Sequence, residues 1–146
     1  MENKFDYQSV PYGFTHCFNN QCTHKEECLH HLAAENCTSQ YPTLNIINPN
    51  CIPADTAGCP YFRTSKKYRV AWGIRHLLDN VPHKCAAPMR NQFIGYFGKT
   101  TYYRFYRQEQ GLFPKAQAYI RQVFKQNGIA EEPKFERYSE EYNYNG

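Results

Sequence analysis

The sequence predicts a mainly α-helical protein, in which an N-terminal metal-knuckle and loop region packs on a small four-helix, helix-turn-helix-like domain. Two observations favour this fold class. Apolar residues recur at helical spacing through much of residues 65–128, and six of the seven cysteines lie within residues 1–60. Only 41% of the 146 residues are hydrophobic and 16% are aromatic, so Phe and Tyr must supply much of the core. This length suffices for one core or for a small domain with an appendage.

Composition and charge divide the chain into three parts. Residues 1–60 are cysteine-rich, residues 61–129 are predicted to form a basic helical domain, and residues 130–146 form an acidic, Tyr-rich tail that we expect to be flexible. Residues 60–128 contain thirteen Lys and Arg against two acidic residues, a net charge of +11, whereas residues 1–59 carry −4 and the last eighteen carry −3. Such a field favours a polyanionic partner, because each phosphate that is neutralised releases counterions. The alternative is a solvated basic surface without a partner.

The first helix of the basic domain is predicted over residues 65–80, with Ser65 as its N-cap. Its apolar residues recur at helical spacing: Val70, Ile74, Leu77 and Leu78. Gly73 inside this stretch costs about 1 kcal/mol relative to alanine, so we expect it to allow close packing there.

Residues 88–109 predict two helices joined by a glycine turn. Pro88 is expected to open the first helix and Gly98 to end it. Thr100 is the expected cap of the second helix. The apolar stripe of the first helix is Met89, Phe93 and Phe97, and that of the second is Tyr102, Phe105 and Tyr106. Two short helices joined in this way match the helix-turn-helix pattern.

The last predicted helix begins at Pro114. Its inward residues are expected to be Ala116, Ile120, Val123 and Phe124. Gly128 followed by Ile129 is typical of a Schellman stop, in which the glycine takes a left-handed conformation and the next residue packs back on the helix. This helix completes the predicted four-helix domain.

The predicted nucleic-acid contacts, with DNA as the expected partner, lie on the second helix of the pair and on the basic stretch before it. Arg104 and Arg107 fall away from the apolar stripe and are expected to face bases or phosphates, while the lysines are expected to contact the backbone. The complete predicted set is Lys66, Lys67, Arg69, Lys99, Thr100, Thr101, Arg104 and Arg107.

Three cysteines in THCFNNQCTHKEEC are spaced like the ligands of a structural metal site. Four residues separate Cys17 from Cys22, and five separate Cys22 from Cys28. A knuckle followed by the early part of a helix can aim thiolates at one point, as structural zinc sites do. An odd number of cysteines without a secretory signal argues against a disulfide framework. The sequence therefore predicts a zinc site, with an iron-sulfur cluster or buried unliganded thiols as the alternatives.

A helix is predicted from about residue 24 to residue 35, because Thr23 and Glu26 form a capping box, and Cys28 would then lie in its second turn. Cys59 is our choice of fourth ligand. The segment GCPYF places it on a tight turn, and Cys followed by Pro frequently ends an iron-sulfur ligand run. The other candidates stay open: Cys37, Cys51, His24, His30 and His31.

The sequence also excludes several classes of protein. No apolar run approaches the roughly 18 residues that cross a bilayer, and MENKFDY lacks the basic start and apolar core of a signal peptide, so we expect a soluble, cytoplasmic protein. The chain contains no nucleophile elbow, phosphate loop or paired-carboxylate arrangement. It therefore predicts a binding protein, not an enzyme.

Four segments together carry a resemblance to a known family: CFNNQCTHKEECLHHLA, NPNCIPADTAGCPYFR, AWGIRHLLDNVP and FGKTTYYRFYRQE. With them the chain resembles a family of small proteins of unknown function from Bacteroides and its relatives, which implies no activity. The fragment FGKTTYYRFYRQEQGLFPKAQAYI is similar to repressor-type helix-turn-helix regions. That similarity implies a recognition helix followed by a further helix. The run of aromatic residues from Tyr102 to Tyr106 departs from the usual pattern of such helices.

Overall fold

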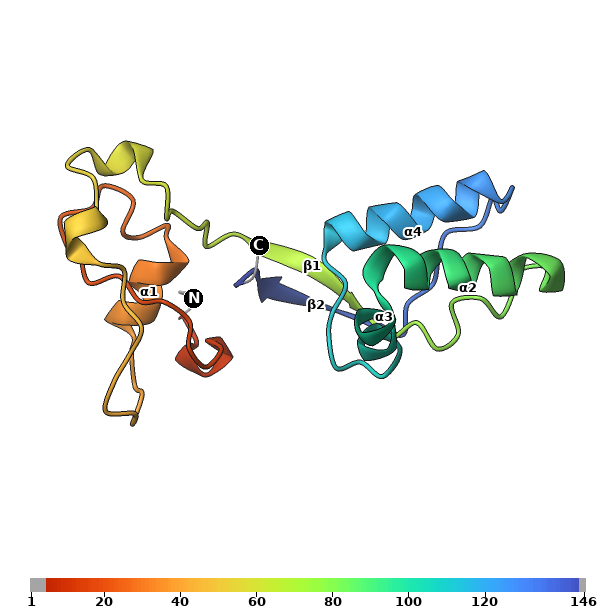
Figure 1. Ribbon diagram of the computed structural model, residues 1–146, viewed down its shortest axis with the longest axis horizontal. Helices are drawn as coiled ribbons and strands as arrows, with labels where there is room; N and C mark the ends of the chain where they lie inside the picture. The colour runs from red at the N-terminus through yellow and green to blue at the C-terminus, as the bar shows by residue number, and fades with distance from the viewer. Residues whose placement is uncertain (1–4, 145–146) are drawn as a thin grey trace. The chain divides into compact units, whose positions relative to one another are not determined.

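The structure is a computed structural model that describes residues 5–144. It divides the chain into two compact units: unit 1 spans residues 1–66 and 142–146, and unit 2 spans residues 67–141. The described residues form four α-helices and one two-stranded sheet, so the fold is mainly α (Figure 1). Within that part of the chain, no helix has both the length and the apolar character needed to cross a membrane.

Three helices build the core of unit 2: α2 (His83–Phe97), α3 (Lys99–Tyr106) and α4 (Pro114–Gln126). Helices α2 and α4 run antiparallel, and Tyr96 of α2 stacks on Tyr119 of α4 with ring centroids 3.6 Å apart (Figure 1). The predicted apolar stripes supply the buried core residues: Met89, Phe93, Tyr102, Phe105, Ile120, Val123 and Phe124. The helical spacing thus identified the inward faces of all three helices correctly.

The helix predicted over residues 65–80 is wrong. Residues Lys67–Trp72 form strand β1, and turns follow it. Aromatic and β-branched residues alternate along this segment, which favours a strand, and Val70 and Ala71 are both fully buried. Gly73 then has φ +88, which a right-handed helix does not allow. Residues 61–129 therefore contain three helices and a strand where four helices were expected.

The C-terminal tail, expected to be flexible, supplies the partner of that strand. Strand β2 (Arg137–Tyr142) pairs with β1, and Trp72 Nε1 donates a 2.7 Å hydrogen bond to Ser139 Oγ. The guanidinium of Arg137 lies 4.4 Å from the centre of the Trp72 ring. Gly73 explains the close approach of the tail, because a Cβ atom there would collide with the side chain of Glu136. Local composition concealed this pairing, since it depends on contacts with β1, which is distant in the sequence.

The predicted ends of the helices agree with the structure better than their predicted starts do. Gly98 separates α2 from α3 with φ +88 and ψ 148. Gly128 ends α4 in a Schellman motif, in which the amide of Ile129 donates to Phe124 O at 3.0 Å. Two details were wrong: Pro88 lies inside α2, which begins at residue 83, and Thr100 forms no cap, because α3 begins one residue earlier after the glycine.

Gln117 is a buried polar residue that periodicity did not single out. It lies on the inner face of α4 with 5% of its surface exposed. Its side-chain amide donates to Arg69 O at 2.9 Å and to Leu112 O at 2.8 Å. The backbone of Leu112 also exchanges two hydrogen bonds with Ala71. One side chain therefore connects α4, β1 and the loop that precedes α4.

Unit 1 contains little regular structure. Its one α-helix among the described residues is α1 (Leu29–Glu35), which is shorter than the predicted helix from residue 24. The expected capping box does not form, because Thr23 contacts Thr56 Oγ1 instead, at 3.1 Å from its amide and 3.2 Å from its hydroxyl. Residues 23–27 are turns, and Cys28 is the N-cap of α1, not a residue of its second turn.

Backbone pairing holds the long loops of unit 1 in place. Leu29 N donates to Arg63 O and Ser65 N donates to Glu27 O, both at 2.8 Å, so residues 63–65 run beside residues 27–29. A parallel bridge joins His16 to Ile46 in the same way. The His16–Ile46 bridge places the proline-rich segment 38–60 beside the N-terminal arm, and the pairing of residues 63–65 with residues 27–29 holds the end of that segment near α1.

Candidate metal centre and basic helix face

The four cysteines predicted as metal ligands lie around one small cavity of unit 1. Cys17, Cys22, Cys28 and Cys59 all contribute to the walls of a space of about 20 Å³. The remaining wall is largely apolar and includes Ile47, Ile52 and Phe62. A space of this size holds about one water-sized particle. It suits a single ion and is too small for an organic ligand.

Three segments bring these thiols together. The amide of Cys17 donates to His30 O at 2.9 Å, which holds the N-terminal arm against α1. Cys28 caps that helix, and the pairing of residues 63–65 with residues 27–29 carries the preceding loop back toward it. Cys59 follows the 3-10 turn Thr56–Gly58, where its amide donates to Thr56 O at 3.2 Å. Contacts distant in sequence thus position the fourth cysteine.

Backbone amides already donate hydrogen bonds to two of the sulfur atoms. The amide of His24 donates to Cys22 Sγ at 3.4 Å, and the amide of Asn19 donates to the sulfur of Cys17. In both cases the donor lies two residues after the cysteine. A hydrogen bond to a sulfur atom favours its thiolate form, which is the form that binds metal. If a metal were bound, hydrogen bonds of this kind would orient its sulfur ligands.

Burial and the neighbouring thiols both act on the pKa of Cys17. Burial raises the pKa of the Cys17 thiol most, and the charges of Cys28, Cys22 and Cys59 raise it further, while the Asn19 amide lowers it. Four thiolates around one small apolar space would repel one another without a counter-charge. A divalent cation would remove that repulsion.

The thiols do not yet stand at coordination geometry. Among residues 5–144, no group of three or more His, Cys, Asp or Glu side chains is positioned to hold a metal ion. The shared cavity and the mutual charges show that the sulfur atoms are neighbours, whereas a tetrahedral zinc site requires each to lie about 2.3 Å from one point.

The other candidate ligands have other contacts. His30 Nδ1 lies 2.6 Å from Thr15 O and its ring stacks on Phe14, and burial lowers its pKa. His31 lines the cavity, but its Nε2 lies 3.0 Å from Asn20 Oδ1. Cys37 donates to Tyr7 OH at 3.5 Å, and Cys51 is exposed. All seven cysteines lie within the described residues, and each is free of a disulfide.

The face of α3 opposite its buried stripe carries part of the predicted nucleic-acid set. Lys99, Thr100, Arg104 and Arg107 are exposed, whereas Thr101 is only half-exposed. Positions 100, 104 and 107 share one side of the helix, about 180° from the buried side chains of Tyr102 and Phe105. Arg107 Nε forms a 2.9 Å ion pair with Glu109, and this carboxylate partly neutralises the positive charge of Arg107.

The basic stretch before α2 does not extend this face in any contact that the structure shows. Lys66 belongs to unit 1, and Lys67 and Arg69 lie on β1. The Arg69 guanidinium packs over the Tyr138 ring of β2 at 3.9 Å from its centre. The predicted set is therefore divided between two elements of unit 2 and a residue of unit 1.

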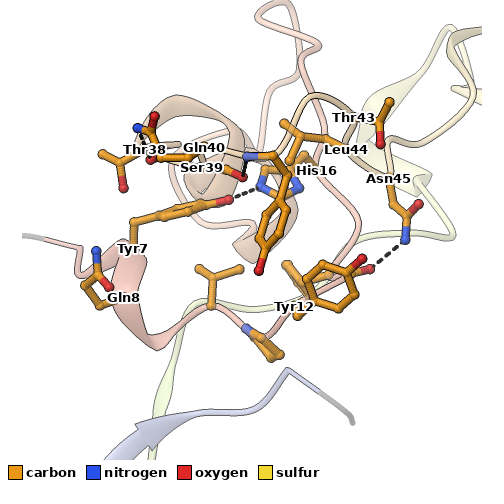
Figure 2. A pocket seen from close by; sticks show the side chains of 15 residues that line it. Tyr7, Gln8, Tyr12, His16, Thr38, Ser39, Gln40, Thr43, Leu44 and Asn45 are labelled. Carbon is orange, nitrogen blue, oxygen red and sulfur yellow. Dashed lines mark hydrogen bonds between the residues drawn. The ribbon is translucent and has the colours of Figure 1, made fainter.

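A second cavity of unit 1 was not predicted from the sequence. It has a volume of about 700 Å³ and lies between residues 7–16 and residues 38–45 (Figure 2). Its floor includes Tyr7 and the buried His16, whose Nε2 lies 2.8 Å from the tyrosine hydroxyl. The only signal in the sequence was a concentration of Tyr, Thr, Asn and Gln in two separate loops. Nothing local indicated that these loops face each other.

Fold and site together define a small, mainly α protein with a cysteine-lined cavity in one unit and a basic helix face in the other. The chain belongs to DUF6078, a family of unknown function, whose family model matches residues 1–144. This confirms the predicted membership of a family without an assigned function. No curated protein and no solved structure matches the chain.

Proposed function

We propose that the chain is a metal-stabilised nucleic-acid-binding protein, in which Cys17, Cys22, Cys28 and Cys59 hold a structural zinc ion in unit 1 and the exposed face of α3 contacts DNA. The observation that carries the proposal is that these four cysteines line one ion-sized cavity. A tetrahedral set of four thiolates is a common structural zinc site, and such sites commonly stabilise units that lack a large apolar core. Unit 1 is of this kind, with a single seven-residue α-helix among its described residues. The proposal also places the protein in the cytoplasm, where thiols stay reduced.

Metal analysis of the purified protein tests the first half. We expect about one zinc per chain, because the site has four ligands. Cys22→Ser should lose the metal, since it removes a thiol and the acceptor of the His24 amide. Cys51→Ser is the matched control, because that thiol is exposed and lies outside the cavity. Zinc-free wild-type protein, or equal zinc content in the two variants, would overturn the proposal.

The same four thiols favour a second candidate, an iron-sulfur protein, because Cys59 is followed by Pro60. Anaerobic purification distinguishes the two. A cluster gives a brown protein with visible absorption that bleaches on reduction, together with iron and acid-labile sulfide, whereas zinc is colourless. The nucleic-acid half of the proposal does not depend on which metal is found.

DNA binding is supported by the charge of residues 60–128 and by the placement of Arg104 on the open side of α3. We expect Arg104→Ala with Arg107→Ala to weaken binding of duplex DNA measured by fluorescence anisotropy. The slope of log K against log salt should fall by about 0.9 for each phosphate that the variant no longer neutralises. The double variant Lys115→Ala, Lys125→Ala is charge-matched and changes exposed residues of α4. Equal weakening in both variants would indicate a non-specific field, and no binding by the wild type would end the assignment.

A further inference from the structure

The cavity between residues 7–16 and residues 38–45 is a second candidate site, built from residues other than the four cysteines and α3. Its walls are held by backbone pairing: His16 N donates to Asn45 O at 2.8 Å, and Ile47 N donates to His16 O at 2.9 Å. Asn45 Nδ2 also donates to Gly13 O at 2.9 Å across the two walls. A volume of about 700 Å³ falls in the range of small-molecule sites.

The charge of the lining excludes many ligand classes. Among the described residues that line the cavity, none is Lys, Arg, Asp or Glu. A phosphate, carboxylate or ammonium group would lose hydration there without meeting an opposite charge. The cavity therefore suits a neutral ligand.

The polar groups of the lining match a ligand that both donates and accepts hydrogen bonds at many points. Hydroxyls and carboxamides make up most of them, and each such group has donor and acceptor capacity. The hydroxyl-bearing residues are Tyr7, Tyr12, Thr38, Ser39, Tyr41 and Thr43. Gln8, Gln40 and Asn45 supply the carboxamides. Apolar ligands such as lipids would leave most of these groups unpaired.

The aromatic geometry selects among neutral polar ligands. Tyr12 and Tyr41 are 85% and 63% exposed, and their rings meet edge to face with centroids 5.1 Å apart and an interplanar angle of 67°. No gap is left between them for a flat base to be inserted in parallel. Each ring still offers an open face. The C–H face of a sugar ring packs on a single aromatic face, while its hydroxyls point outward to polar partners.

We propose that this cavity binds a neutral saccharide, with the sugar ring packed on Tyr12 or Tyr41 and its hydroxyls bonded to the carboxamide and hydroxyl groups of the two loops. Figure 2 shows Tyr7 and His16 on one side of the cavity and Tyr12 and Asn45 on the other. His16 Nδ1 has no hydrogen-bond partner among residues 5–144, so the floor also contains a buried polar atom that is unsatisfied. The proposed sugar site shares none of its lining residues with the cysteine-lined cavity or with α3.

Isothermal titration calorimetry on the full-length protein, with maltose and cellobiose as probes, tests the proposal. We expect one of them to bind, and Tyr12→Ala or Tyr41→Ala to weaken binding about tenfold, as the loss of one aromatic stack predicts. Both rings are exposed, so their truncation should leave the fold intact. Tyr61→Ala is the control, because that side chain is also exposed but does not line the cavity. Longer oligomers of the bound sugar distinguish a groove for a polymer chain, which should bind them more tightly, from a site for a short free sugar.

A charged sugar and a flat nucleoside serve as probes that could contradict the proposal. Glucose 6-phosphate should bind more weakly than glucose, because the lining offers no cation. Tighter binding of the phosphate, or preferential binding of adenosine, would overturn the saccharide assignment. So would the absence of heat with every neutral sugar at millimolar concentration, or equal affinity of the Tyr12→Ala, Tyr41→Ala and wild-type proteins.

Discussion

The backbone amide of His24 donates a hydrogen bond to Cys22 Sγ at 3.4 Å. The donor lies two residues after the acceptor, and the amide of Asn19 stands in the same relation to Cys17. The Asn19 amide lowers the pKa of the Cys17 thiol, but burial raises that pKa more, so the loop favours the neutral thiol on balance. A hydrogen bond within an irregular loop thus holds the sulfur atom of Cys22.

Removal of the proposed metal should unfold unit 1 selectively. Metal binding and folding are coupled in units of this kind, because the ligands are brought together only in the folded state. We expect amides of α1 and of residues 17–28 to exchange hydrogen faster after treatment with a chelator. Amides of α4 in unit 2 serve as the internal control and should keep their protection. Unchanged exchange in α1 would show that no metal supports the unit.

Gly98→Ala should destabilise the protein, because φ +88 with ψ 148 is a conformation that side chains rarely adopt. We expect a loss of about 1–3 kcal/mol in the free energy of unfolding, measured by urea denaturation. Gly95→Ala is the matched control inside α2, where a Cβ would meet nothing within 4 Å. This second change should stabilise the protein by about 0.5–1 kcal/mol, since alanine favours a helix. Effects of equal sign would contradict the role assigned to the turn.

Gln117→Met should also destabilise unit 2. The side chain keeps its approximate size but loses both hydrogen bonds, to Arg69 O and to Leu112 O. We expect a cost of about 1–3 kcal/mol, since each of the two lost hydrogen bonds contributes about 0.5–1.5 kcal/mol. Gln122→Met on the exposed side of the same helix should change the free energy of unfolding by less than about 0.5 kcal/mol. A comparable loss in both variants would mean that the buried amide contributes nothing specific.

Tyr7 should make stability fall at alkaline pH. Burial, followed by the hydrogen bond and charge of Cys37, raises its pKa from 10.0 to about 12. A raised pKa means that the folded state favours the neutral phenol. Its contribution to stability is therefore complete below the unfolded value of 10.0 and is lost as the pH rises toward about 12.

Comparison of Tyr7→Phe with the wild type by thermal unfolding between pH 9 and pH 11, a window of about one unit on either side of the ordinary tyrosine pKa, measures this contribution. The variant should lose less stability than the wild type over that interval. Tyr61→Phe, at an exposed position of the same unit, should behave like the wild type. A steeper alkaline loss in Tyr7→Phe would show that the direction of the shift is wrong.

Several features of unit 2 could be predicted because their causes are local. The apolar spacing of α2, α3 and α4 identified the buried faces, and Gly98 and Gly128 ended their helices at the predicted positions. The wrong prediction for residues 65–80 also has a physical reason. Residues 67–72 were predicted as helix because Val70 is in helical register with Ile74 and Leu77, but the alternation of Tyr68, Val70 and Trp72 fits the strand that pairs with residues 137–142. Propensity is a weak influence where tertiary contacts are available.

By itself, the sequence determined the candidate residues: three closely spaced cysteines, the basic stretch and the amphipathic helices, because side-chain type and short-range spacing can be read directly from it. Only the tertiary structure decided that Cys59 reaches the cavity lined by Cys17 and Cys28, that the tail becomes a strand, and that two Tyr-rich loops enclose a neutral cavity. These outcomes depend on backbone hydrogen bonds between segments distant in the chain. Such bonds leave no periodic signal, because any residue except proline can donate them.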